Sequence, residues 1–203
     1  MRVLIFDIGN VVIKADHGIT HKKLVEYGVP EERVGTFFTN DGYKDFGRGK
    51  ISGRDFYFDL IGKYLRHTLT YEQVVQAHDI HMYAVDSGVL NALGRLLETY
   101  NNPDRRLMFW TDTNEWQTRR EGELVKISKY GQAIRSDDMR LLKRDAGSFH
   151  RVLAMLGAEP EEVTLVDDNP EICKLAKENG LKAHLFRNSK ELDDFLAAEG
   201  HLK

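Results

Sequence analysis

The sequence predicts an α/β protein in which helices cover both faces of a parallel sheet. Two observations support this fold class. Helical and strand patterns alternate from Ser87 to the end of the chain, as they do in folds built around a parallel sheet. An apolar run typical of a buried strand also opens the chain, but residues 14–85 after it have helical patterning and no predicted strand. We therefore expect a core of residues 1–13 and 86–203, with residues 14–85 inserted as a helical unit after the first strand.

The first strand is predicted at residues 3–6 and ends at Asp7, which is followed by Ile8, Gly9 and Asn10. In an open parallel sheet, ligands bind outside the carboxyl ends of the strands, so Asp7 is expected to face the site. Gly9 allows the backbone to turn and to approach a ligand closely. Asp7 is therefore our candidate nucleophile, although an Asp at this place is also compatible with a simple cap of the following turn.

The inserted segment is expected to contain about four short helices. Pro30 marks the start of one of them, and the pairs Ser52 with Asp55 and Thr70 with Gln73 have the spacing of capping boxes at two more. The Phe and Tyr side chains of this segment are expected to form its own core and its contact with the rest of the chain.

The remaining elements are predicted from apolar periodicity and from turn residues. In order they are a helix at 89–97, a strand at 107–110 ending at Thr111, a short strand at 132–134, a helix at 146–156, a strand at 163–166 ending at Asp167 and Asp168, a helix between Pro170 and Gly180, a strand at 182–186 and a helix at 192–198.

Composition and charge narrow the class of protein. The 203 residues suffice for a sizeable core, and 41% hydrophobic with 30% charged residues is ordinary for a globular protein. A formal charge of -3 gives no reason to expect nucleic acid or an anionic membrane as a partner. The first apolar run is too short for a signal peptide, so we expect a cytoplasmic protein. The single cysteine, Cys173, excludes an internal disulfide and fits a reducing compartment.

Three predicted strands end in groups that suit phosphate or a cation, namely Asp7, Thr111 and the pair Asp167 and Asp168. If these strands are neighbours, three carboxylates meet, and like charges so close together require a compensating cation. Ligation by oxygen atoms alone suits Mg2+, and the carbonyl of Gly9 can supply one further oxygen. The sequence therefore predicts a Mg2+ site at this edge of the sheet.

Lys143 offers the positive charge that such a site needs. It precedes a predicted helix, and from there it can balance the carboxylates and hold a phosphoryl group. Taken alone, this lysine is more typical of a solvated surface position, so its assignment depends on the other groups.

Together these motifs resemble those of the haloacid dehalogenase-like (HAD) superfamily of hydrolases. Their order and spacing cover the whole chain: Phe-Asp-Ile-Gly-Asn-Val-Val at 6–12, Phe-Trp-Thr at 109–111, Lys143 and Val-Asp-Asp-Asn at 166–169. Gly-Arg-Gly-Lys-Ile-Ser at 47–52 also resembles the helical cap of the subfamily whose cap follows the first motif. The pattern is most similar to bacterial sugar-phosphate phosphatases with an Asp-x-Gly-Asn first motif, including glucose-1-phosphate phosphatases.

The resemblance implies a Rossmann-like three-layer core with an inserted α-helical cap, and hydrolysis of a small phosphomonoester such as a sugar phosphate with Mg2+ as cofactor. Asp7 would attack phosphorus and form an aspartyl-phosphate, while Thr111 and Lys143 would hold the phosphoryl oxygens. The site residues that it implies are Asp7, Thr111, Lys143 and Asp168 for catalysis, and Asp7, Asp167 and the Gly9 carbonyl for Mg2+.

By the same resemblance, Asp168 would support the metal or orient Lys143. A cap that closes over the site brings its own side chains, and His17, Tyr43 and Arg48 are candidates for contact with the substrate.

Three positions depart from the pattern of the superfamily. Gly9 stands where most of its phosphatases have a second Asp that acts as general acid and base. Such help is worth roughly 10²–10⁴-fold in rate, so slow turnover is expected unless a water or another group substitutes. Asp112 stands where Asn is usual, and Arg144 where Pro usually follows the lysine. Neither of these two changes removes a reacting group.

Two other functions remain compatible with the sequence. A 2-haloacid dehalogenase also lacks the second Asp and would use Asp7 to displace halide without a metal, but it has less use for the paired Asp167 and Asp168. A binding or regulatory protein could have kept the fold and the phosphate site while losing its chemistry at Gly9.

Overall fold

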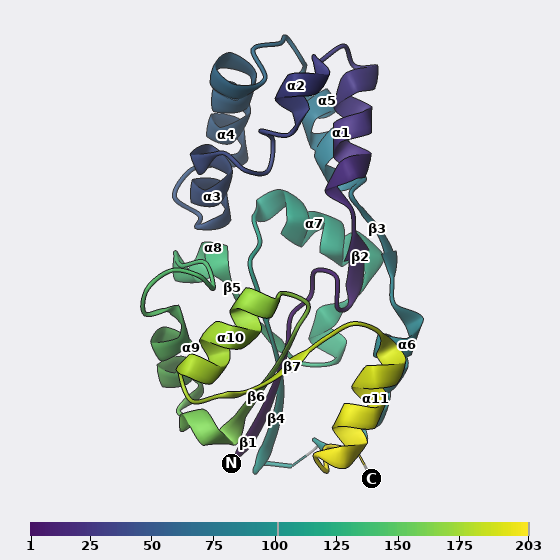
Figure 1. The fold of residues 1–203 in the computed structure, drawn as a ribbon, viewed down its shortest axis with the longest axis vertical. Coiled ribbons are helices and arrows are strands. Elements are labelled where there is room, and N and C mark those ends of the chain that lie inside the picture. The colour runs from purple at the N-terminus through teal and green to yellow at the C-terminus, as the bar shows by residue number, and fades with distance from the viewer. Residues whose placement is uncertain (101, 203) are drawn as a thin grey trace.

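The computed structural model describes residues 1–100 and 102–202 and has a parallel sheet with helices on both faces (Figure 1). This confirms the predicted α/β fold class. The five strands lie in the order β5-β4-β1-β6-β7, with bounds β1 Arg2–Phe6, β4 Arg105–Thr111, β5 Gln132–Arg135, β6 Val163–Asp167 and β7 Lys182–Leu185.

The helices of the core connect these strands. They are α6 Ser87–Thr99, α7 Glu115–Leu124, η2 Ile127–Lys129, α8 Ser136–Met139, α9 Ser148–Leu156, η3 Pro160–Glu162, α10 Pro170–Glu178 and α11 Ser189–Ala198. Helix α9 begins two residues later than predicted, because Gly147 before it adopts a left-handed conformation with φ of 80°. Within the described residues, no helix has the length and apolar character that a membrane span requires.

Strand β1 lies at the centre of the sheet. It pairs in parallel with β4 and with β6, so that Phe6 is opposite Phe109 on one side and Val166 on the other. A central strand of a parallel sheet is buried on both faces, which explains the unbroken apolar run in its sequence. The carboxyl ends of β1, β4 and β6 consequently meet at one edge of the sheet.

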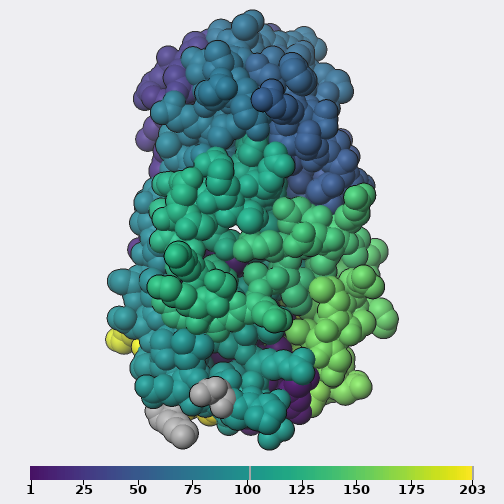
Figure 2. Space-filling view, turned by 180° about the vertical axis from the view of Figure 1, so that it is seen from behind, coloured from purple at the N-terminus to yellow at the C-terminus, as the bar shows by residue number. Residues whose placement is uncertain are grey.

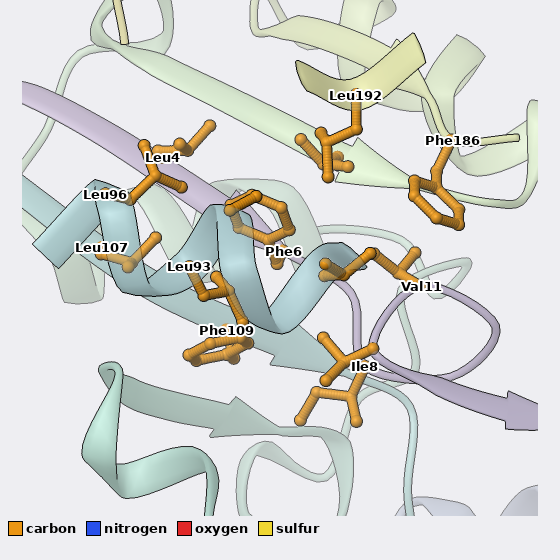
Figure 3. Close-up of a cluster of buried hydrophobic side chains, with 14 of the residues drawn as sticks. Leu4, Phe6, Ile8, Val11, Leu93, Leu96, Leu107, Phe109, Phe186 and Leu192 are labelled. Atoms are coloured by element: carbon orange, nitrogen blue, oxygen red, sulfur yellow. The ribbon is translucent and has the colours of Figure 1, made fainter. Parts of the chain in front are cut away.

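Alternate side chains of β1 belong to two separate hydrophobic clusters. Leu4 and Phe6 pack with Leu93 of α6 and Leu192 of α11 on one face (Figure 3). Val3 and Ile5 point to the opposite face, where the cluster is completed by Phe149, Val152, Ile172 and Ala176 of α9 and α10. The sheet is thus fixed between two helical layers, and these layers hold the strand ends in place.

The inserted helices form the other end of the molecule, above the carboxyl edge of the sheet in the view of Figure 1 and at the blue end of Figure 2. Their own cluster has Phe37, Phe46 and Phe56 as fully buried members. The predicted capping boxes are present at Ser52 and Thr70. The elements are α1 His17–Glu26, α2 Glu31–Val34, α3 Asp41–Gly47, α4 Gly53–Asp59, η1 Leu60–Tyr64 and α5 Tyr71–Asp79.

The prediction of no strand between residues 14 and 85 was wrong. Strands β2 (Ile13–Ala15) and β3 (Met82–Val85) form an antiparallel pair that leads into and out of the inserted helices. Both are short, and each has one buried residue, so neither shows the alternation from which a strand is recognised in a sequence. They pair with each other across the whole helical segment, and the predicted boundaries of this segment fall within β2 and at the end of β3.

Two leucines of α6 test the packing of the helical layer. Leu93 is fully buried against the sheet, whereas Leu97, one turn further along, is 37% exposed. We expect Leu93→Ala to lower the free energy of unfolding by about 2–5 kcal/mol because it leaves a cavity. The matched Leu97→Ala is expected to change it by less than about 0.5 kcal/mol. Urea denaturation of both variants measures the difference, and equal losses would contradict the burial assigned to Leu93.

Candidate active site

The sheet brings together the predicted site residues at its carboxyl edge. Asp7 directly follows β1, its amide donates to the carbonyl of Val166 in β6 at 2.8 Å, and its residue surface is 8% exposed. Asp167 ends β6 and is 1% exposed. Two buried carboxylates from neighbouring strands therefore lie side by side.

Lys143 lies between these two carboxylates. Its Nζ is 2.7 Å from Oδ1 of Asp7 and 2.7 Å from Oδ2 of Asp167. The lysine backbone is also fixed, because its amide donates to Oδ1 of Asp112 at 2.8 Å and its carbonyl accepts from the hydroxyl of Ser148 at 2.6 Å. The solvated surface position is excluded, since Lys143 is 3% exposed.

The site holds more negative charge than one lysine can balance. Carboxylate oxygens of Asp7, Asp167 and Asp168 lie within 4.8 Å of one another. Burial raises the pKa of Asp7 to about 7, against the lowering effect of Lys143 and with a further increase from Asp167. Burial and Asp167 also raise the pKa of Asp168. For Lys143, burial lowers the pKa, but the nearby carboxylates outweigh it and keep the amine protonated.

This set of donors fits a divalent cation. Three carboxylates that share one ammonium group retain a net negative charge, and hard oxygen ligands of this kind are what Mg2+ prefers. Burial is the main cause of the raised pKa of Asp7, Asp167 adds to it, and a cation at the carboxylates would lower it. Asp7, Asp167 and Asp168 are accordingly the side chains that could hold Mg2+.

The loop after Asp7 is held by hydrogen bonds that fix Gly9. Gly9 forms a bridge to Ile13, and the Asn10 amide donates to the Ile13 carbonyl at 2.7 Å. Asn10 has a positive φ of 51°, a conformation that Asn tolerates better than most residues. A hydrogen bond from Asn10 also acts on the carboxyl group of Asp168 and lowers its pKa, opposing the effect of burial. The loop thus connects the segment around Gly9 to the third carboxylate.

Thr111 lies at the end of β4 and is 5% exposed. Its hydroxyl makes a long contact of 3.4 Å with the carbonyl of Asp112, which leaves it available to a ligand. Thr111, Gly9 and Asp112 line a small cavity of about 40 Å³, together with Ile8, which follows Asp7. The structure therefore places all of the predicted site residues along one edge of the sheet.

A larger cavity of about 520 Å³ lies between the inserted helices and the core. His17, Tyr43 and Arg48 line it from the inserted segment, and Asp112 and Asn169 line it from the core. Its volume is in the range of cavities that bind small molecules. The three candidates for substrate contact thus line one cavity, which also borders Asp112 after Thr111 and Asn169 after Asp168.

One connection between the inserted segment and the core was missed from the sequence. The guanidinium of Arg48, after α3, donates from Nε and Nη2 to the two carboxylate oxygens of Asp145, each at 2.7 Å. Asp145 also accepts from the amide of Leu142 at 2.9 Å, so it holds the loop that carries Lys143. Hydrogen bonding to Arg48 lowers the pKa of Asp145. A signal for this pair was present, because Arg48 lies in the motif that resembles a cap and Asp145 lies two residues after Lys143.

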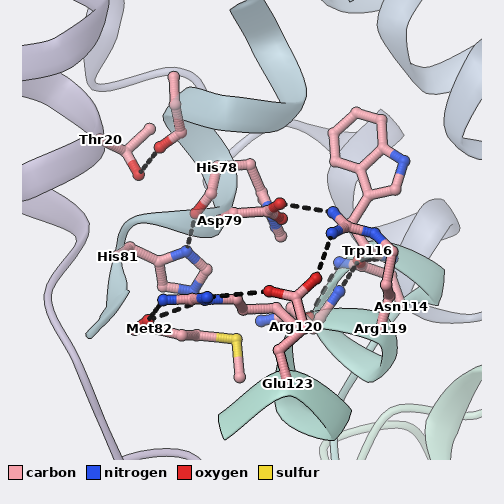
Figure 4. A network of polar contacts seen from close by, with 12 residues as sticks. Thr20, His78, Asp79, His81, Met82, Asn114, Trp116, Arg119, Arg120 and Glu123 are labelled. Atoms are coloured by element: carbon pink, nitrogen blue, oxygen red, sulfur yellow. Dashed lines mark hydrogen bonds and ion pairs between the residues drawn. The ribbon is translucent and has the colours of Figure 1, made fainter. Parts of the chain in front are cut away.

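Helix α7 attaches the core to the inserted segment at a second place. Arg119 forms an ion pair with Asp79 at the end of α5, and Arg120 donates to the Met82 carbonyl at the start of β3 at 3.2 Å (Figure 4). Trp116 of the same helix packs inside the aromatic cluster of the inserted helices, with its ring 4.9 Å from that of Phe46. The inserted helices are therefore joined to the core on both sides of the cavity.

Comparison with known proteins supports the fold. No family model matches the sequence, and no curated protein matches it. Solved structures do match. A HAD-family enzyme from Bacteroides thetaiotaomicron, solved with magnesium and inorganic phosphate, has a TM-score of 0.80 and 19% identity over 93% of this chain and 95% of that one. A protein described as a predicted HAD-like family hydrolase from Porphyromonas gingivalis has a TM-score of 0.81 and 20% identity, covering 100% and 99%.

A HAD phosphatase from Thermococcus onnurineus is also similar, with a TM-score of 0.61 and 20% identity over 97% of this chain and 98% of that one. At these levels of identity, the comparison shows a shared fold. The chain has the HAD fold along its whole length, so the resemblance recognised in the sequence is confirmed at the level of the fold.

The buried carboxylate of Asp7 predicts a pH-dependent stability of the metal-free protein. The folded-state pKa of about 7 lies above the ordinary value of 3.8, so the protonated folded form is favoured. This contribution is complete below about pH 4 and is lost as the pH rises through about 7. In EDTA at pH 8, we therefore expect Asp7→Asn to be more stable than the wild type by on the order of 1–3 kcal/mol.

At pH 5 this difference should become small, because Asp7 is then protonated in the wild type. Urea denaturation at both pH values measures it, and Mg2+ provides the control, since it should stabilise the wild type more than Asp7→Asn. An Asp7→Asn variant that is less stable than the wild type at pH 8 in EDTA would contradict the charge balance described above.

Proposed function

We propose that this protein hydrolyses a small phosphomonoester, a sugar phosphate or a similar compound, with Asp7 as nucleophile and Mg2+ as cofactor. The observation that supports this best is the position of Lys143, which is within hydrogen-bond distance of Asp7 and Asp167 in a buried cluster of three carboxylates. A carboxylate nucleophile beside a fixed ammonium group suits an attack on phosphorus, where negative charge must be neutralised.

Two further findings support a phosphoryl substrate. The HAD-family enzyme from Bacteroides thetaiotaomicron with the same fold was solved with magnesium and inorganic phosphate. The cavity of about 520 Å³ has Lys44, Arg48 and Arg144 among its lining residues, and these positive groups favour an anionic ligand. A metal-free dehalogenase would have no use for the excess negative charge of Asp7, Asp167 and Asp168.

The reaction would proceed in two steps. In the first, a carboxylate oxygen of Asp7 forms a bond to phosphorus and the ester bond between phosphorus and the substrate oxygen breaks, releasing the alcohol. In the second, water attacks phosphorus, the bond to Asp7 breaks, and inorganic phosphate leaves. Lys143 and the hydroxyl of Thr111 would hold the phosphoryl oxygens during both displacements.

Asp7, Asp167 and the carbonyl of Gly9 would hold Mg2+, and Asp168 would support this site or help to orient Lys143. When bound, the metal supplies positive charge that offsets the charge of the phosphoryl group. We propose further that residues 14–85 act as a cap, which excludes water from the cavity and contacts the part of the substrate that leaves.

The direct test is phosphate release from a panel of sugar phosphates and other small phosphomonoesters, with Mg2+ and with EDTA. We expect phosphate release that depends on Mg2+ and that in Asp7→Asn falls to the level of a sample without protein. Asp194→Asn on α11 is the matched control, since this exposed carboxylate lies far from the site in the sheet and should keep full activity.

Release that survives Asp7→Asn would contradict the role of Asp7. No release from the wild type across the panel would contradict the proposed function. Halide release from 2-haloacids would then identify the protein as a dehalogenase.

The contact between Arg48 and Asp145 predicts an effect on substrate affinity. Lysine cannot reproduce the two parallel hydrogen bonds of a guanidinium, so Arg48→Lys should weaken cap closure and displace the loop of Lys143. We expect a decrease in kcat/KM of roughly tenfold, mostly through KM, which corresponds to about 1.4 kcal/mol. Lys63→Met is the control, because this exposed lysine of the inserted segment pairs with Asp59 one turn away and does not line the cavity. Equal kinetics for Arg48→Lys and the wild type would rule out this role.

A further inference from the structure

We propose that Asp112 is the general acid and base of the reaction, and that it replaces the acid that Gly9 cannot provide. This inference rests on the proposed phosphatase function and identifies the residue that exchanges a proton with the substrate. It is carried by the position of Asp112, by the hydrogen bond that orients it and by the absence of a better placed acid among the described residues that line the cavity.

Asp112 and Gly9 line the same small cavity at the carboxyl edge of the sheet. Asp112 follows β4 directly, and Gly9 lies in the turn after β1, the neighbouring strand. Gly9 leaves room for a side chain, since a Cβ atom built there would meet Oδ2 of Asp7 at 3.8 Å and have no closer neighbour outside the adjoining residues. The space next to the nucleophile is thus open at position 9.

The open space is shared with Asp112. The cavity of about 40 Å³ is lined by Gly9, Thr111 and Asp112, and Asp112 also lines the cavity of about 520 Å³. An acid that protonates a leaving group must reach the oxygen that departs, and in the second step the attacking water at the same place. Asp112 borders the larger cavity, which is the space proposed for that part of the substrate.

One oxygen of Asp112 is fixed and the other is available. Oδ1 accepts the amide hydrogen of Lys143 at 2.8 Å, which orients the carboxyl group. Within residues 1–100 and 102–202, Oδ2 accepts no hydrogen bond. The surface of Asp112 is exposed to solvent, so this oxygen is open to a ligand in the cavity. An oriented carboxyl group that can hold a proton is suited to acid-base work.

The other titratable groups at the cavity are less suitable. Asp145 is bound to Arg48 through both oxygens, and its pKa is lowered, so it does not hold a proton. His17 is stacked on Phe38 with 3.7 Å between ring centroids. The charged groups that affect the pKa of His17 belong to the inserted segment and not to the cluster of Asp7, Lys143 and Asp167. Asp112, in contrast, interacts electrostatically with Lys143 of that cluster.

The proton balance of both steps follows from this assignment. As an oxygen of Asp7 bonds to phosphorus and the ester bond breaks, the proton on Asp112 passes to the leaving oxygen, which departs as an alcohol. Asp112, now ionised, takes a proton from water while the water oxygen bonds to phosphorus and the bond to Asp7 breaks. Phosphate, free Asp7 and protonated Asp112 result, and no other reactant is required.

The test compares Asp112→Asn with the wild type on two substrates. Asparagine has nearly the same shape and can still accept from the Lys143 amide, so the loop should be preserved, which circular dichroism checks. For an alkyl phosphate, whose leaving group needs a proton, we expect kcat to fall by roughly 10²–10⁴-fold.

For p-nitrophenyl phosphate, whose leaving group departs without a proton, the rapid first release of nitrophenolate should persist within about threefold. Its steady turnover should fall because the second step still needs a base, and phosphorylated protein should accumulate in intact-mass spectra.

Restoring an acid in the same space provides the rescue. The double variant Gly9→Asp with Asp112→Asn should have a kcat at least about tenfold above that of Asp112→Asn alone. The double variant Gly9→Ala with Asp112→Asn fills the space without an acid, and its kcat should not rise above that of Asp112→Asn. The proposal is overturned if Asp112→Asn hydrolyses the alkyl phosphate within about threefold of the wild type. It is also overturned if the first release from p-nitrophenyl phosphate falls as much as the alkyl rate does, since that pattern indicates a structural role. A wild type that releases no phosphate at all contradicts the proposed function itself.

Discussion

Lys143 lies between two carboxylates from neighbouring strands, and the organisation of the site depends on this buried contact. Asp7 and Asp167 are within 2.7 Å of the same ammonium group, and both are shielded from water. Buried charges are tolerated when they are paired, and the loss of Lys143 would cost about 3–5 kcal/mol because it leaves the buried carboxylates uncompensated. The positions of β1, β6 and the loop before α9 are therefore coupled through one side chain. The ammonium group that we propose to bind a phosphoryl oxygen also holds the carboxylate of Asp7 in place.

Much of the core and of the site could be predicted from the sequence, because the signals are local. Asp7, Thr111 and Asp167 each follow an apolar strand directly, and parallel strands place their carboxyl ends at one edge. The sequence could not show that the Nζ of Lys143 lies between Asp7 and Asp167, since that contact depends on how the loop before α9 folds. Strands β2 and β3 were missed because three or four residues with one buried side chain carry no periodicity.

The contacts around the cavity could not be predicted from the sequence either. Arg48 and Asp145 are far apart in the chain, and an Arg or an Asp on a polar stretch is ordinarily solvated. Trp116 lies in α7, a helix of the core that was not predicted from the sequence, but it packs in the aromatic cluster of the inserted helices. Both cases arise when the inserted segment folds over the sheet edge, an event with no local signature. The core and the inserted helices are consequently less separate than their sequence boundaries suggest.

The central place of β1 has a consequence for how the chain folds. This strand is synthesised before both of its partners, which are residues 105–109 on one side and 163–166 on the other. At about 5–20 residues per second, the ribosome needs roughly 10–30 s after making β1 before β6 exists. Until then an apolar strand with two unpaired edges is exposed, and contacts so distant in sequence slow folding. The segment that leads to Asp7 is thus made well before the strands that complete its pairing, which makes it a part of the newly made chain that needs protection from aggregation.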